Sequence, residues 1–210
     1  MKTYTEKTLY ERALKRWENE GGGILPIGSP HRSDDAIKIW TIGHSTRELA
    51  EFLELLALNR IEAVADVRSY PGSRKFPQFN AEALKNSLPA NNITYVPFKQ
   101  LGGRRRSRPD SPNTVWHNEA FRGYADYMET VEFRVGVDVL LELARKKRTA
   151  IMCAEAVWWR CHRSMISDYL KAAGITVEHI MDGGKNTIHP FTSAARIDNG
   201  KLVYGAAESI

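Results

Sequence analysis

The sequence predicts an α/β fold, a single Rossmann-like three-layer domain with a mostly parallel sheet of about five strands. Short apolar runs alternate with segments of helical spacing from residue 37 onward, a pattern typical of strand–helix–strand units. The chain has 210 residues and is 42% hydrophobic, which is enough to bury one good core. We therefore expect residues 37–210 to form one domain, preceded by an N-terminal extension.

The expected extension covers residues 1–36. Leu9, Ala13, Leu14 and Trp17 have helical spacing, so residues 5–19 are expected to form a helix. Glycines at positions 21, 22 and 23 end this helix, and the stretch to residue 35 is rich in Gly, Pro and Ser. We interpret the segment as a helix and a linker, in which the helix either docks on the domain or stays mobile.

The elements of the domain follow in order. Apolar runs predict strands at residues 37–42, 61–67, 93–98, 149–153 and 175–180. Helical spacing predicts helices at residues 46–59, 80–88, 121–147 with a break near Glu132, and 161–173. Ser45 and Glu48 fit a capping box before the first helix, and Asn80 fits a cap of the second. Residues 198–200, Asp-Asn-Gly, fit the turn of a hairpin in the tail.

Charge and cysteine content narrow the class of partner. The net charge of +5 and the pI of about 9.2 favour an anionic partner, either a phosphate-bearing small molecule or a nucleic acid. The two cysteines predict free thiols and a cytoplasmic location. The longest apolar run is far short of a membrane span, and residues 1–20 lack the apolar core of a secretory signal. We therefore expect no membrane partner.

Polar residues or glycines lie at the carboxyl end of every predicted strand, in its last residues or just after it. In chain order these are His44 and Ser45, Asp66 and Arg68, Gly102 and Gly103, Cys153 and Glu155, and His179 and Asp182. Because the carboxyl ends of parallel strands meet at one edge of a sheet, ligands bind there. The sequence therefore predicts a single crevice lined by these groups.

The residues at the first two strand ends also have structural interpretations. Ser45 is either a helix cap or an anion-binding hydroxyl, and His44 is either a core histidine or a proton carrier. Asp66 and Arg68 either pair with each other or bind a ligand, because two charges ending an apolar strand are unfavourable without partners. We place His44 and Asp66 among the candidate catalytic residues, and Ser45, Arg68 and Arg74 among the candidate anion ligands.

The segment from Cys153 to Arg163 is the richest in chemistry. It joins a buried strand to a helix and places Cys161 at the helix N-terminus, where the helix dipole and nearby cations lower a thiol pKa. Arg160, His162 and Arg163 make the same helix end a candidate anion site.

Three interpretations of the cysteines stay open. Cys153 is by default a small buried core residue, whereas a thiolate nucleophile is the second interpretation, with Cys161 ahead of Cys153. The third is a metal site formed by both thiols with His44 or His162, but the spacing matches no standard zinc pattern. We therefore predict no metal and no cofactor. The spacing from Cys153 to Arg160 is also one residue longer than a phosphatase loop, so phosphatase chemistry is not predicted.

Glu155 and an arginine-rich loop complete the candidate site. Glu155 is the best general acid or base because it follows a buried strand, and its alternative is an ion pair with Arg163 or Arg68. Beside Gly102 and Gly103, a run of arginines either stays solvated or closes over a polyanion. Its members are Arg104, Arg105, Arg106 and Arg108. Trp158 and Trp159 either stack on a base or are buried.

Several ordered motifs resemble one family. They are Thr41-Ile42-Gly43-His44-Ser45, Asp66-Val67-Arg68 with Pro71 and Ser73-Arg74, Leu101-Gly102-Gly103, Cys153-Ala154-Glu155 and Cys161-His162-Arg163. This series is similar to the uncharacterised bacterial and archaeal domain-of-unknown-function family four-eight-eight. The resemblance implies an α/β domain with signature positions at His44, Asp66, Arg68, Cys153, Glu155, Cys161, His162 and Arg163, and it implies no reaction. Some relatives carry an iron–sulfur assembly label, but two cysteines poorly support a cluster scaffold.

The sequence is compatible with three candidate functions. The leading hypothesis is an enzyme acting on a phosphorylated small molecule, nucleotide or nucleic-acid end. In it Arg68 and Arg163 hold the anion, while Glu155 or Asp66 moves protons with His44 assisting. The second is a nucleic-acid-binding or regulatory module that uses the loop 104–108. The third is a thiol redox or metal-binding protein.

Overall fold

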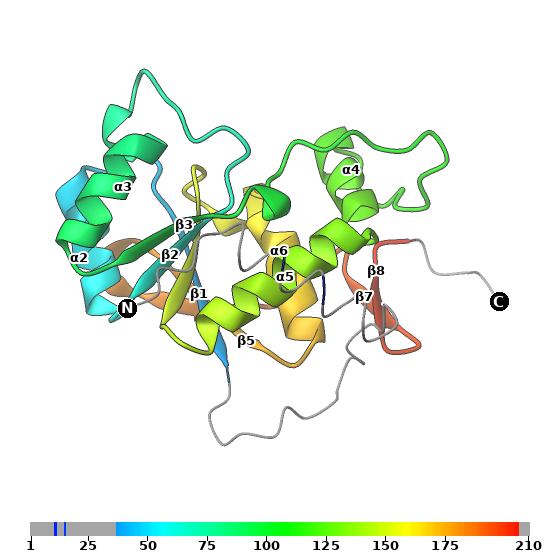
Figure 1. The fold of residues 1–210 in the computed structure, drawn as a ribbon. Helices are drawn as coiled ribbons and strands as arrows, with labels where there is room; N and C mark the ends of the chain where they lie inside the picture. Colours follow the sequence, from blue (N-terminus) through cyan, green and yellow to red (C-terminus); the bar gives the residue numbers. More distant parts are fainter. Residues whose placement is uncertain (1–10, 12–14, 16–36, 206–210) are drawn as a thin grey trace.

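The computed structural model describes residues 37–205 together with Glu11 and Lys15. Residues 37–205 form an α/β fold in which a six-stranded sheet lies between two layers of helices (Figure 1). This is the Rossmann-like three-layer arrangement that the sequence predicts. Glu11 and Lys15 are helical, but the rest of the helix predicted over residues 5–19 and the linker after it lie outside the described residues.

The main sheet has the strand order β3-β2-β4-β1-β5-β6. Its strands are β1 (Lys38–Gly43), β2 (Ala63–Asp66), β3 (Thr94–Pro97), β4 (Thr149–Cys153), β5 (Thr176–Ile180) and β6 (Asn186–Ile188). The first five are parallel, at the positions the apolar runs predict, and β6 is antiparallel to β5. Because β4 lies between β1 and β2, the carboxyl ends of these three strands are adjacent.

Helices cover both faces of the sheet (Figure 1). One face packs against α2 (Leu49–Leu58) and α3 (Ala81–Ala90), where Phe52, Leu84 and Ile42 share a buried cluster. The other packs against α4 (Glu119–Met128), α5 (Val131–Ala144) and α6 (Arg163–Ala172), and there Leu140 and Ile166 are buried with Ile151. Burial of apolar surface on both faces is what stabilises a parallel sheet.

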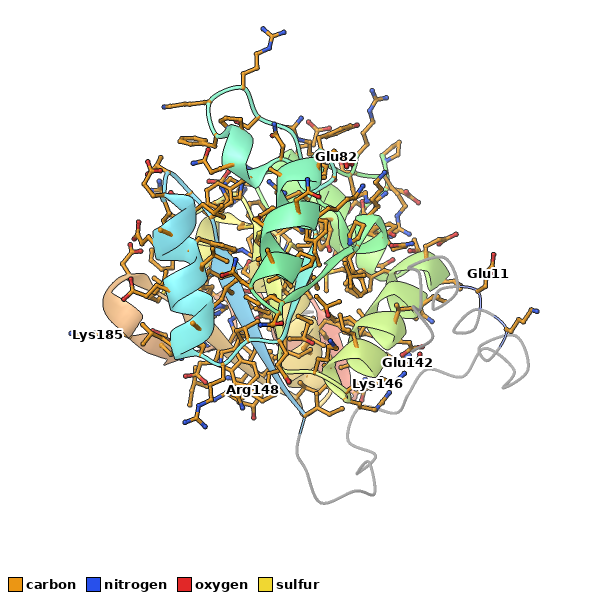
Figure 2. All side chains as sticks on the ribbon, turned by 60° about the vertical axis from the view of Figure 1, so that its left-hand side comes forward. Glu11, Glu82, Glu142, Lys146, Arg148 and Lys185 are labelled. Atoms are coloured by element: carbon orange, nitrogen blue, oxygen red, sulfur yellow. The ribbon has the colours of Figure 1, made fainter. Side chains whose placement is uncertain are left out.

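The amino ends and the carboxyl ends of the parallel strands form two opposite edges of the sheet, and these lie at opposite ends of the molecule. Figure 2 shows Glu82, in the first turn of α3, at one end and Arg148, just before β4, at the other. At the amino-terminal edge the Arg148 guanidinium lies 4.2 Å from the centre of the Trp40 ring and bonds the carbonyl of Asn59. The candidate site residues belong to the carboxyl-terminal edge.

The capping predictions for α2 and α3 are wrong. Ser45 lies before the helix in a turn with φ of 51°, and Glu48, at the N-cap position, makes no side-chain cap. The Ser45 N–H instead donates to the Ala154 carbonyl, because β1 continues past its last strand residue alongside the segment after β4. Asn80 is at the N-cap position of α3, but its side chain accepts from the Ser73 N–H rather than from the helix.

The predicted break in the long helical segment is confirmed. It falls between α4 and α5, where Thr130 caps α5 by accepting from the Phe133 N–H, a few residues before the predicted position. The tail hairpin is confirmed as β7 (Arg196–Asp198) and β8 (Lys201–Val203), with Asn199 and Gly200 at positive φ. No helix among the described residues is both long and apolar enough to cross a membrane.

Candidate functional site

The segment between β4 and α6 is held against the end of β1. Backbone N–H groups of His44 and Ser45 donate to the carbonyls of Cys153 and Ala154 at 3.0 and 2.8 Å. The approach is so close that a Cβ on Gly43 would lie 1.8 Å from the Glu155 carbonyl oxygen. Glycine at this position is therefore required for the segment that carries both cysteines to lie where it does.

A pocket of about 310 Å³ opens at this edge of the sheet. Its walls come from the ends of β2 and β4, the loop after β3, the start of α4 and the turn before α6. The lining residues are Arg68, Ser69, Tyr70, Gly103, Arg104, Ala120, Phe121, Cys153, Ala154, Glu155, Arg160, Cys161 and His162. The pocket thus brings two thiols, one carboxylate, one imidazole and three guanidinium groups into a single cavity.

The family comparison covers most of this site. Residues 48–170 match the family described as "Domain of unknown function DUF488". The chain belongs to this family. The matched span begins just before α2 and ends within α6, so it includes β2, β4 and every residue that lines the pocket. No curated protein and no solved structure matches the chain significantly.

In this DUF488 domain the Cys161 sulfur is surrounded by groups that stabilise a thiolate. The Arg163 Nε–H donates to Cys161 Sγ at 3.4 Å, and His162 Nδ1 lies 3.6 Å from the same sulfur. The Cys153 thiol, which donates to Cys161, and the charges of Arg163 and His162 together lower the pKa of Cys161 well below its usual value despite its burial. The same hydrogen bond and burial raise the pKa of Cys153.

The hydrogen bonds of His162 fix the orientation of its ring. Nε2 lies 3.1 Å from the carbonyl oxygen of Val67, which can only accept, so Nε2 carries a proton. In the protonated ring Nδ1 donates to Cys161 Sγ, whereas in the neutral ring it presents its lone pair toward this sulfur. The ring also packs edge-on against Tyr124, with the ring centroids 5.1 Å apart.

Arg163 lies behind the pocket rather than in its wall. Its side chain is 1% exposed, and Nη2 donates to the Glu155 carbonyl at 2.6 Å. With Nε on Cys161, this guanidinium ties the two ends of the β4–α6 segment together. The Glu155 carboxylate, by contrast, is exposed at the pocket and forms no ion pair among the described residues.

Arg68 reaches the pocket from a buried polar network. Asp66 accepts from its Nε at 2.8 Å and from Nη2 at 2.6 Å, and the Tyr95 hydroxyl donates to the same carboxylate at 2.7 Å. Bidentate hydrogen bonding to a carboxylate fixes the plane of the guanidinium group. The structure therefore shows Asp66 and Arg68 paired with each other, which is one of the two alternatives that the sequence left open.

His44 supports Arg68 from the other side. Its Nδ1 lies 3.0 Å from the Ser45 carbonyl and donates to it, so Nε2 is free to accept from Arg68 Nη1 at 3.1 Å. Burial and the charge of Arg68 lower the pKa of His44 to about 4, so the imidazole is neutral near pH 7. Its ring stacks on Phe79 at a centroid distance of 4.4 Å.

The structure divides the predicted site residues into two groups. Seven line the pocket, namely Arg68, Gly103, Cys153, Glu155, Arg160, Cys161 and His162. Six lie outside its wall, namely His44, Ser45, Asp66, Arg74, Gly102 and Arg163. His44, Asp66 and Arg163 nevertheless bond directly to lining residues, whereas Arg74 is exposed in the loop after β2.

His179, at the fifth strand end, belongs to a separate buried network. Its Nδ1 bonds Thr41 Oγ1 at 2.7 Å and its Nε2 bonds His189 Nδ1 at 2.9 Å, and His189 Nε2 lies 3.0 Å from Asp168 Oδ1. Trp158 stacks on the His179 ring at 4.3 Å. This network joins β5, α6 and the tail, and none of its histidines lines the pocket.

The arginine-rich loop is anchored to α4. The Asp126 carboxylate accepts from the Arg108 backbone N–H, the Ser111 hydroxyl and the Asn113 amide at 2.5 to 2.8 Å. The Arg105 guanidinium lies 3.7 Å from the centre of the Tyr127 ring. A Cβ on Gly123 would lie 2.4 Å from the Arg105 carbonyl, so the loop rests directly on the helix. Arg104 lines the pocket.

The pocket also contains a possible metal-ligand set. One ligand atom each of Cys153, Cys161 and His162 lie within 4.8 Å of one another. A site formed by both thiols and His162 is one of the alternatives that the sequence leaves open, but it was not predicted because the spacing matches no standard zinc pattern.

Sequence reasoning missed the apolar wall of the pocket. Tyr70, Ala120 and Phe121 line it, and Tyr95 completes the Arg68 network. Tyr70 lies two residues after Arg68 in the loop that follows β2, so its position in the sequence could have predicted that it lines the pocket. Phe121 lies in the first turn of α4, far along the chain, and nothing in its local sequence shows that it faces this edge.

Proposed function

We propose that this chain is an enzyme that acts on a small substrate with a phosphate or other anionic group, and that the Cys161 sulfur is its reactive nucleophile. The observation that supports it most is the pocket itself, in which the Cys161 sulfur shares one cavity with Arg68, Arg104 and Arg160. A sulfur that accepts from Arg163 Nε has the surroundings of activated cysteines.

The remaining groups take roles that follow from their contacts. Arg68, oriented by Asp66 and His44, binds the anion with Arg160. Glu155 is the carboxylate of the pocket wall and is the proposed proton carrier. Asp66 and His44 act on Arg68 as positioning residues, because their polar atoms are engaged in the network and lie outside the wall.

The charge of an alkylating reagent tests this proposal. Iodoacetate and iodoacetamide attack the same sulfur, but iodoacetate carries a carboxylate that the pocket arginines should attract. We expect the rate ratio of iodoacetate to iodoacetamide at Cys161, measured by mass spectrometry, to exceed the ratio for a free thiol such as glutathione by about tenfold.

Two arginine variants give this experiment its control. Arg160→Gln should reduce the ratio toward that of the free thiol. Arg145→Gln should leave it unchanged, because Arg145 follows α5 at the other edge of the sheet. A Cys161 that prefers the neutral reagent, or that reacts more slowly than Cys153, would overturn the proposal.

A further inference from the structure

The ligand cluster in the pocket has the dimensions of a tetrahedral metal site. For zinc bound at about 2.3 Å to sulfur and about 2.0 Å to nitrogen, neighbouring ligand atoms lie roughly 3.5–3.8 Å apart. The observed distance from Cys161 Sγ to His162 Nδ1 is 3.6 Å, and the three candidate ligand atoms of the cluster lie within 4.8 Å of one another. Small side-chain adjustments would thus suffice to close the site around an ion.

The hydrogen bonds around the cluster favour metal binding independently of these distances. A metal-bound histidine commonly donates its second ring N–H to a backbone carbonyl, which fixes the tautomer and the ring direction. His162 Nε2 lies 3.1 Å from the Val67 carbonyl in this way and leaves Nδ1 to face the sulfurs. The Arg163 Nε–H at 3.4 Å from Cys161 Sγ provides an outer hydrogen bond to a ligand sulfur.

We propose that Cys153, Cys161 and His162 form a site for a soft divalent metal ion of the zinc type, with the fourth coordination position open to the pocket. Two thiolates and an imidazole match the ligand preference of zinc, and binding displaces the Cys153 proton to solvent. All three residues line the pocket beside Arg68, Arg160 and Glu155, so the open position faces the space assigned to an anion. Three protein ligands with one open position are typical of catalytic rather than structural zinc.

This inference goes beyond the proposed function and does not depend on it. A metal-bound Cys161 sulfur and a free one are two states of the same atom. The metal-bound state would offer a Lewis acid to the anion, whereas the metal-free state offers a nucleophile. The two are therefore tested under different conditions, with and without added metal.

Cobalt provides a direct probe, because thiolate-bound Co²⁺ in a tetrahedral site gives intense visible and near-ultraviolet absorption. We expect the full chain, reduced with a phosphine, to bind one equivalent of Co²⁺ with sulfur charge-transfer bands, and one equivalent of Zn²⁺ to remove them. His162→Gln should weaken Co²⁺ binding by at least about tenfold, whereas His117→Gln, in the exposed loop before α4, should not.

A glycine pair tests the geometry without removing a ligand. A Cβ on Gly103 would lie 2.9 Å from His162 Nδ1, so Gly103→Ala should displace the ring and weaken Co²⁺ binding by about tenfold or more. Gly72→Ala is the matched control, because a Cβ there meets no atom within 4 Å. Equal binding by both alanine variants would overturn the proposed ligand set.

The wild-type chain provides a readout that no folding defect can obscure. Zn²⁺ should protect both Cys153 and Cys161 from iodoacetamide. Unprotected cysteines, or cobalt spectra without sulfur charge transfer, would rule out the metal site. If the anionic reagent is still preferred at Cys161 in the metal-free chain, the proposed function stands without the metal. If metal binds but that preference is absent, the metal site stands and the proposed nucleophile falls.

Discussion

The two histidines beside the pocket differ because their hydrogen-bond partners differ. His44 donates from Nδ1 to the Ser45 carbonyl and accepts from Arg68 at Nε2, an arrangement that suits the neutral ring. His162 bonds a carbonyl through Nε2 and faces a sulfur with Nδ1. One histidine therefore accepts a hydrogen bond from the Arg68 guanidinium, whereas the other contacts the Cys161 sulfur. The sequence identified both histidines but could not assign these tautomers, because each depends on a partner from another element.

The lowered pKa of His44 predicts a pH dependence of stability. The unfolded chain takes up a proton at a pKa of about 6.5, whereas the folded chain does so at about 4, so protonation favours unfolding in between. The contribution of His44 is complete above pH of about 6.5 and is lost as the pH falls toward 4. His44→Gln should abolish a loss on the order of 1–2 kcal/mol between pH 7 and pH 5, measured by urea denaturation. Parallel losses in the wild type and the variant would contradict this account.

Asp66 and Tyr95 provide a graded test of the Arg68 network. Asp66→Asn leaves the buried Arg68 guanidinium without a counter-charge, which should destabilise the fold by about 3–5 kcal/mol. Tyr95→Phe removes one hydrogen bond to a carboxylate that keeps its arginine, and should destabilise it by about 1–2 kcal/mol. Urea midpoints of the two variants check the order. A larger effect of Tyr95→Phe would show that the ion pair is not the centre of the network.

At the scale of elements, the loop before α4 is anchored at a buried carboxylate, Asp126. Burial alone would raise the pKa of Asp126, but hydrogen bonds from Ser111, the Arg108 N–H and Asn113 lower it overall. The resulting stabilisation is complete above a pH of about 4 and is lost as the pH falls through the lowered value. At neutral pH the loop is therefore held on α4.

Asp126→Asn should release this loop. Asn cannot accept from all three donors, so we expect trypsin to cleave after Arg104, Arg105 and Arg106 several times faster than in the wild type. Glu132→Gln is the control, because this carboxylate is exposed in the first turn of α5. Mass spectrometry of the fragments locates the cuts. Unchanged cleavage in Asp126→Asn would show that the loop is held by other contacts.

The sequence predicts helices, strands and turns correctly where the signal is local. It fails where contacts with residues distant in the sequence determine the local structure. The five parallel strands and the Asn199-Gly200 turn follow from apolar runs and turn chemistry in the sequence alone. Strand β6 has three residues, two of them exposed, so it carries no apolar signal and forms because β5 offers a free edge. Ser45 did not cap α2 because its backbone pairs with Ala154, far away in the chain.

At the scale of the whole molecule, strand order decides which strand ends share a pocket. The sequence predicted that five ends meet at one edge, but not that β4 lies between β2 and β1. Asp66 is in register with Met152, so Arg68 and the residues after Cys153 meet. Strand β5 lies beyond β1, and its His179 joins a different network. Single-chain patterns do not encode this order, because it is set by packing between elements distant in the sequence.

In the proposed function, arginines from separate elements hold an anion beside Cys161. The decisive measurement is whether inorganic phosphate protects Cys161 from neutral iodoacetamide, at an ionic strength that is kept constant with chloride. We predict that phosphate slows the labelling of Cys161 in the metal-free wild type and in Arg145→Gln, and that Arg160→Gln loses most of this protection. Labelling that is indifferent to phosphate, or protection that survives in Arg160→Gln, would show that these arginines hold no anion beside Cys161.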